Sequence, residues 1–190
     1  TLTNTSTGAL STSGVGALAI TAAVSGATGV SITNSSAHTA TAISQLGINS
    51  TATSAITSSL GAISISSTTN STAFAVSLLG PLSAKTGITI NATGATTTTV
   101  ATLSAITLTG AGSQLAVNAR NTSTTGNNGI KALGAISLAS GSGLSFVTNN
   151  IITVSGAISV AANNAGAAAN LVFDTSTGTN ASAVALNGAI

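Results

Sequence analysis

The chain of 190 residues is predicted to fold as an all-β parallel β-solenoid, with about 22 residues and three short strands per rung and with loop insertions. Three observations predict this fold. A five-residue phrase recurs along the chain, and short aliphatic stretches alternate with the period of two that β-strands show. In addition, most positions carry small residues, with 36 Ala, 34 Thr, 29 Ser, 21 Gly and 16 Asn.

The recurring phrase sets the expected rung length. It consists of Gly-Ala or Ser-Ala, then an aliphatic, a small and another aliphatic residue, and it occurs as GALAI at 16–20, GAISI at 61–65, SAITL at 104–108, GAISL at 134–138, GAISV at 156–160 and GAI at 188–190. Successive starts lie 45, 43, 30, 22 and 32 residues apart. We interpret the first two intervals as about twice 22, and the others as one rung with or without an insertion.

The strands of one rung are clearest between residues 134 and 155, where GAISL, GLSFVT and NIITV follow one another, separated by turn-forming Ser, Gly and Asn. Further strands are expected at VSIT 30–33, ITIN 88–91, LAVN 115–118 and LVF 171–173. The pattern is loosest at 34–60 and 118–133. Inward-facing residues that stack from rung to rung are expected to include Ile63, Ile65, Ile136, Leu138, Phe146, Ile158 and Val160.

Four asparagines, Asn91, Asn118, Asn149 and Asn150, are expected at corners of the solenoid. We favour simple turn positions for them over side-chain ladders between rungs. A helical fold is disfavoured, because Thr, Ser, Gly and Asn are poor in helix interiors and no apolar stripe of helical period persists, even though 161–169 contains six Ala. A β fold other than a solenoid stays open.

The phrase set of GAIxV, GxLxF and NxIxV in a background rich in Thr, Ser, Asn and Gly resembles the repeat regions of large bacterial surface proteins. The similar families are adhesins of the filamentous-haemagglutinin type and the passenger domains of autotransporters. This resemblance implies a right-handed β-helix, export to the cell exterior, and adhesion or matrix building without catalysis.

The titratable residues are few: Lys85, Arg120, Lys131, Asp174 and His38. With no Cys, one acid and one His, the sequence predicts no metal site, no cofactor and no enzyme. Along a solenoid, His38 and Asp174 would lie about 30 Å apart, too far for a catalytic relay. Three cations cannot neutralise a nucleic acid backbone. Because they lie in or beside the irregular segments KTG, ARN and GIKA, they are expected to be exposed loop residues. No apolar run is long enough for a membrane span.

The sequence offers little support for two surface functions, N-glycosylation and ice binding. Sequons for N-glycosylation are no more frequent than chance in so Ser- and Thr-rich a chain, and their acceptors are Asn4, Asn34, Asn49, Asn70, Asn91, Asn121 and Asn180. Ice binding would need rows of threonine on one face, but Thr-X-Thr pairs such as those at 1–3, 51–53, 107–109 and 175–177 have no rung-like period.

We therefore expect residues 1–190 to form a single solenoid segment, either a fragment of a longer repetitive chain or one unit of a fibre. The expected function is that of a non-enzymatic structural shaft in a secreted or cell-surface adhesin or an extracellular matrix protein. A self-assembling extracellular filament or sheath subunit is the alternative, and an ice-binding protein is a weaker one. Expected partners are copies of the chain or adjoining repeats, with glycans or a surface as further candidates, because a nearly uncharged exterior favours association.

Overall fold

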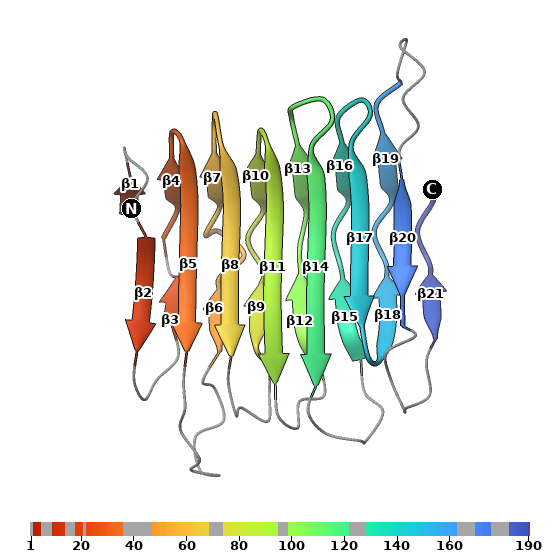
Figure 1. Cartoon of the computed structure of the whole chain (residues 1–190), viewed down its shortest axis with the longest axis horizontal. Helices are drawn as coiled ribbons and strands as arrows, with labels where there is room; N and C mark the ends of the chain where they lie inside the picture. Colours follow the sequence, from red (N-terminus) through yellow and green to blue (C-terminus); the bar gives the residue numbers. More distant parts are fainter. Residues whose placement is uncertain are drawn as a thin grey trace.

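A computed structural model describes residues 2–4, 9–13, 18–20, 22–35, 47–68, 74–94, 99–121, 128–162, 170–175 and 183–190. In these residues all regular structure is β-strand, arranged in three parallel seven-stranded sheets that form the sides of one solenoid (Figure 1). The predicted three-sided parallel β-solenoid is confirmed.

Sheet A has three-residue strands, in the order β1 (Leu2–Asn4), β4 (Val24–Gly26), β7 (Ile56–Ser58), β10 (Leu82–Ala84), β13 (Ile106–Leu108), β16 (Ile136–Leu138) and β19 (Ile158–Val160). Sheet B has the longest strands, β2 (Ala9–Ser13), β5 (Gly29–Ser35), β8 (Ala62–Thr68), β11 (Gly87–Gly94), β14 (Gln114–Asn121), β17 (Gly143–Thr148) and β20 (Leu171–Asp174). Sheet C contains β3 (Leu18–Ile20), β6 (Ile48–Ser50), β9 (Val76–Leu78), β12 (Thr99–Leu103), β15 (Asn128–Ala132), β18 (Ile151–Val154) and β21 (Val184–Leu186).

Each strand pairs with the strand three places later in the chain, so one coil passes through sheets A, B and C in turn. The coil repeats every 27 residues or so. The step from Ile136 to its partner Ile158 is 22 residues, whereas the step from Ile32 to Ile65 is 33 residues. The predicted 22-residue rung is therefore the shortest coil, and longer connections between the sheets account for the rest.

The recurring phrase does not always lie on the same sheet. Its copy at 16–20 contributes β3 of sheet C, the copy at 61–65 contributes β8 of sheet B, and the next three contribute β13, β16 and β19 of sheet A. The intervals of 45 and 43 residues each span five strands, or one and two-thirds coils, and their interpretation as two rungs is wrong. The phrase specifies a small-residue turn followed by a strand, which more than one side of the prism can use.

The glycines of the phrase have a steric role at the corner between sheets C and A, here called the C–A corner. A Cβ atom on Gly156 would overlap the carbonyl oxygen of Gly134, and one on Gly188 would overlap that of Gly156. At Gly156 and Gly188 the backbones of successive coils therefore approach each other too closely for a side chain. This stack explains why the phrase keeps glycine at 134, 156 and 188.

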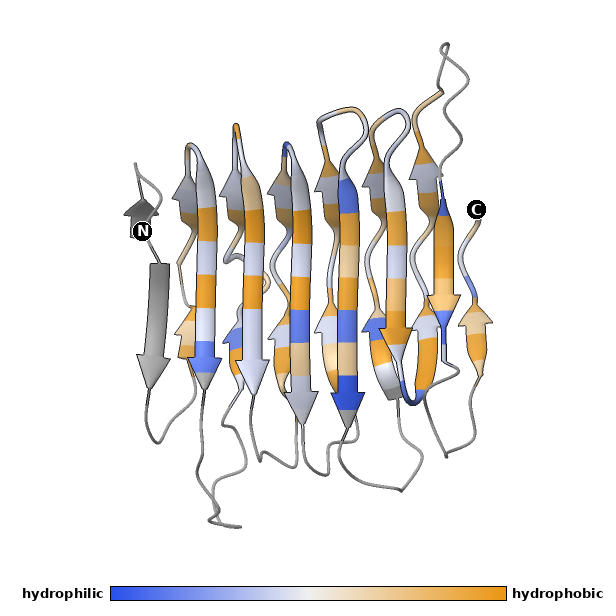
Figure 2. Cartoon of the chain, viewed as in Figure 1, coloured by the Kyte–Doolittle hydropathy of each residue, from blue (hydrophilic) through white to orange (hydrophobic). Residues whose placement is uncertain are grey.

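The interior of the prism is mainly aliphatic, and its buried residues come from many of the described strands. Figure 2 shows hydrophobic and hydrophilic residues alternating along the longer strands. Of the seven predicted core residues, Ile63, Ile65, Ile136, Leu138, Phe146 and Ile158 are buried. Val160 is 36% exposed, because it lies in the last strand of sheet A and no described strand covers it. The Phe146 and Phe173 rings meet edge to face with centroids 5.9 Å apart.

The asparagines divide into two pairs. Asn149 and Asn150 lie in the turn between β17 and β18, as predicted. Asn91 and Asn118 instead lie inside strands β11 and β14, directly opposite each other. There the Asn118 Nδ2 donates a hydrogen bond of 3.1 Å to the Asn91 Oδ1. The turn prediction is wrong for this pair, because parallel in-register strands bring equal side chains together and allow a two-membered ladder.

Buried serines stabilise the wider turns between sheets A and B. The Ser142 Oγ accepts a hydrogen bond of 3.1 Å from the Ser113 amide and donates one of 3.3 Å to the Gly110 carbonyl. The Ser113 Oγ donates to the Lys85 carbonyl at 2.6 Å. Each hydroxyl thus satisfies backbone groups of a neighbouring coil that the strand ladders leave unpaired.

Candidate functional site

The outer face of sheet A carries one outward residue per three-residue strand. In every strand whose side chains the structure describes, that residue has a hydroxyl group, and the register aligns Ser25, Thr57, Ser83, Thr107, Ser137 and Ser159 in one column. The hydroxyls of Ser137 and Ser159 lie 3.5 Å apart. The column is the position between the two aliphatic residues of the recurring phrase, so the sequence held this signal.

The outer face of sheet B is broader, because its central strands have seven or eight residues. One outward column contains Ser31, Ser64, Thr89, Ala116, Ser145 and Val172. The next contains Thr33, Ser66, Asn91, Asn118, Val147 and Asp174. A third, nearer the corner with sheet C, contains Thr68, Thr93 and Arg120. Most of the side chains on this face are small, and most of them are polar.

The outer face of sheet C is narrow like that of sheet A. Its column contains Ala19, Asn49, Ser77, Thr102, Lys131, Thr153 and Ala185. A cation thus lies in the middle of this face, unlike the column of sheet A.

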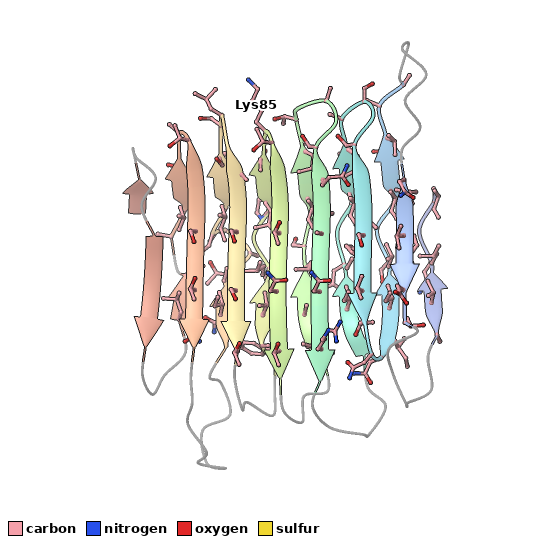
Figure 3. All side chains as sticks on the ribbon, viewed as in Figure 1. Lys85 is labelled. Atoms are coloured by element: carbon pink, nitrogen blue, oxygen red, sulfur yellow. The ribbon has the colours of Figure 1, made fainter. Side chains whose placement is uncertain are left out.

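The charged residues are dispersed over the solenoid. Lys85 is exposed and projects from the turn between β10 and β11 (Figure 3). The prediction of loop cations is wrong for Arg120 and Lys131, which lie in strands β14 and β15. His38 lies outside the described residues, so its predicted separation from Asp174 is not tested. Within the described part of the chain, no three His, Cys, Asp or Glu residues gather where they could hold a metal ion.

The sequon asparagines lie in different environments. Asn91 is exposed in β11, and Asn49 faces outward and is half-buried in β6. The Asn34 side chain is 1% exposed, so a glycan could reach its amide only if strand β5 opened. Asn4 and Asn121 end strands β1 and β14, but their side chains are not described, and Asn70 and Asn180 lie outside the described residues. Of the sequon asparagines whose side chains the structure describes, Asn34, Asn49 and Asn91, each lies in a different strand, and no two are paired with each other.

The Thr-X-Thr pairs do not form a common row. Thr51 and Thr53 lie in the turn between β6 and β7, whereas Thr107 belongs to the hydroxyl column of sheet A. Residues 1 and 177 of the other pairs lie outside the described residues. Sequence reasoning missed the hydroxyl columns, because Ser and Thr alternate in them and a search for threonine alone breaks the repeat.

Comparison of the chain with protein-family models, with curated proteins and with solved structures returns no match. None of the described segments is a helix of the length and apolarity needed to cross a bilayer. The candidate functional site is therefore defined by the three outer faces themselves, of which sheet B provides the largest.

Proposed function

We propose that this chain is a structural β-solenoid shaft of a secreted or cell-surface adhesin or of an extracellular matrix protein, without a catalytic role. The observation that carries the proposal is the repetition of one cross-section through seven coils. Three in-register sheets surround an aliphatic interior, and their outer faces carry mainly Ser, Thr, Asn and Ala. Such a stack extends by adding coils and is stabilised mainly between neighbours, which suits a spacer or stalk.

The location can be tested with antibodies raised against the purified chain. Labelling of intact cells that produce the protein should equal the labelling of permeabilised cells, with an antibody to a cytosolic protein as the control for integrity. Labelling that requires permeabilisation would contradict a surface or secreted location.

A self-assembling filament or sheath subunit is a second candidate, and the low charge of the chain supports it. Only 2% of the residues are charged and the formal net charge is +2. Such a surface offers little electrostatic repulsion between copies of the chain, which favours their association. Filaments of the purified protein, with a spacing of about 4.8 Å along the long axis in fibre diffraction, are expected if the second candidate is correct. Short particles at all concentrations would rule it out.

A further inference from the structure

The outer face of sheet B is large enough for a stable protein interface. Seven strands about 4.8 Å apart span about 29 Å, and the strands, which have from four to eight residues, are on average about 21 Å long. These dimensions give about 600 Å² per copy, or about 1,200 Å² for two facing copies, at the lower end of the range of specific interfaces of about 1,200–2,000 Å². The three-residue strands of sheet A give less than half of this area, which is typical of weak contacts.

Charge distinguishes the faces as well. On sheet B the described outward side chains include one cation, Arg120, and one anion, Asp174, which lie two coils apart on β14 and β20. The face therefore has no net charge, and a second copy would not be repelled. On sheet C, the outward column contains one cation, Lys131, and no anion, so two facing copies would bring together charges of one sign only.

The side chains of this face can be buried at small entropic cost. Ser, Thr, Ala and Val have few rotatable bonds, so little rotamer freedom is lost when they are covered. A hydroxyl both donates and accepts hydrogen bonds, so hydroxyl columns can pair with hydroxyl columns of another copy. At the edge near sheet A the Gln114 side chain lies over Gly143, where a Cβ atom would overlap the Gln114 side-chain amide.

We infer that the outer face of sheet B is a self-association surface on which a second copy of this chain packs face to face. If each coil faces the same coil of the second copy, all seven strands of sheet B are covered and the full area of this face is buried. The Asn91–Asn118 ladder lies within the surface, and its remaining Nδ2 and Oδ1 groups are available to the facing copy. This inference rests on the solenoid geometry and is independent of where the protein acts.

The test measures association of the whole chain by sedimentation over a wide range of concentration. In the face variant, Ser64→Lys and Thr89→Lys place two cations on neighbouring strands of sheet B. In the matched control, Thr107→Lys and Ser137→Lys place two cations on neighbouring strands of sheet A. All four positions are exposed in the single chain, so both variants should fold, as judged by circular dichroism and the denaturation midpoint. We expect a dimer for the wild type and the control, and a Kd at least about a hundredfold higher for the face variant.

Three results would overturn the inference. One is a wild-type chain that stays monomeric throughout the concentration range. Another is equal weakening of the dimer by the two pairs of lysines. The third is association that survives the sheet B lysines but is lost with Leu186→Lys, because the contact would then be end to end through the C-terminal coil. None of these results depends on the cell-labelling experiment, so failure of the inference and failure of the proposed function are distinguishable.

Discussion

The middles of the strands and the corners of the prism are built from different residues. In sheet B, two inward columns run through the strand middles and contain Val30, Ile63, Ile88, Leu115 and Leu144 in one and Ile32, Ile65, Ile90, Val117 and Phe146 in the other. The third inward column, next to sheet C, contains Asn34, Ser67, Ala92, Ala119 and Thr148. Hydrophobic burial thus stabilises the strand middles. At the corners, close backbone contacts restrict the size of the side chains, and buried polar groups depend on hydrogen-bond partners.

The largest expected effect is at the middle of a strand. Phe146 is fully buried between Val117 and Phe173, so Phe146→Ala should lower the free energy of unfolding by about 3–5 kcal/mol through lost burial and the cavity left behind. Chemical denaturation would measure the change. The control Ala119→Gly removes a single methyl group near the corner and should cost much less. Equal losses for both would show that middles and corners do not differ.

A corner should instead be sensitive to added volume. Gly156→Ala places a methyl group against the Gly134 carbonyl at the C–A corner, and the resulting strain should lower the free energy of unfolding by about 1–3 kcal/mol. Gly112, which has nothing within 4 Å of its added Cβ but a φ of +70°, is the control for conformational strain alone. If Gly156→Ala is neutral, the coils do not approach at this corner as closely as the structure shows.

The contrast also explains what could be predicted from the sequence. Period-two aliphatic alternation marks the strand middles, so the strands at 134–155 and the core residues from Ile63 to Ile158 were correctly predicted. Corners leave a weaker signal, because Ser, Ala and Asn occur both at turns and on outer faces. For this reason three features were not predictable: the side of the prism that each phrase occupies, the strand positions of Arg120 and Lys131, and the pairing of Asn91 with Asn118. The hydroxyl column of sheet A was present in the recurring phrase, whereas the outward columns of sheet B needed the register, which only the three-dimensional pairing supplies.

Buried hydroxyls at the corners should give effects of opposite sign. The Ser67 Oγ is buried without a hydrogen-bond partner, so Ser67→Ala should raise the free energy of unfolding by about 1 kcal/mol. The Ser142 Oγ has both a donor and an acceptor partner, and Ser142→Ala should lower the free energy of unfolding by about 1–3 kcal/mol, since the Ser113 amide would be left unpaired. Denaturation midpoints of the two variants compare them directly. Stabilisation by both substitutions would mean that the corner hydroxyls do not differ in their hydrogen bonding.

The smallest effect is expected on the outer face. The hydrogen bond between Asn118 and Asn91 is exposed to solvent, where water replaces a lost partner, so Asn118→Ala should lower the free energy of unfolding by at most about 1 kcal/mol. A double-mutant cycle with Asn91→Ala isolates the interaction of the two amides, and a coupling of about 0.5 kcal/mol is expected. The cycle should be measured at concentrations where the chain is monomeric, because association through sheet B would change the measured coupling energy. A coupling as large as the loss in Phe146→Ala would show that amide ladders, rather than the aliphatic strand middles, dominate the cohesion between coils.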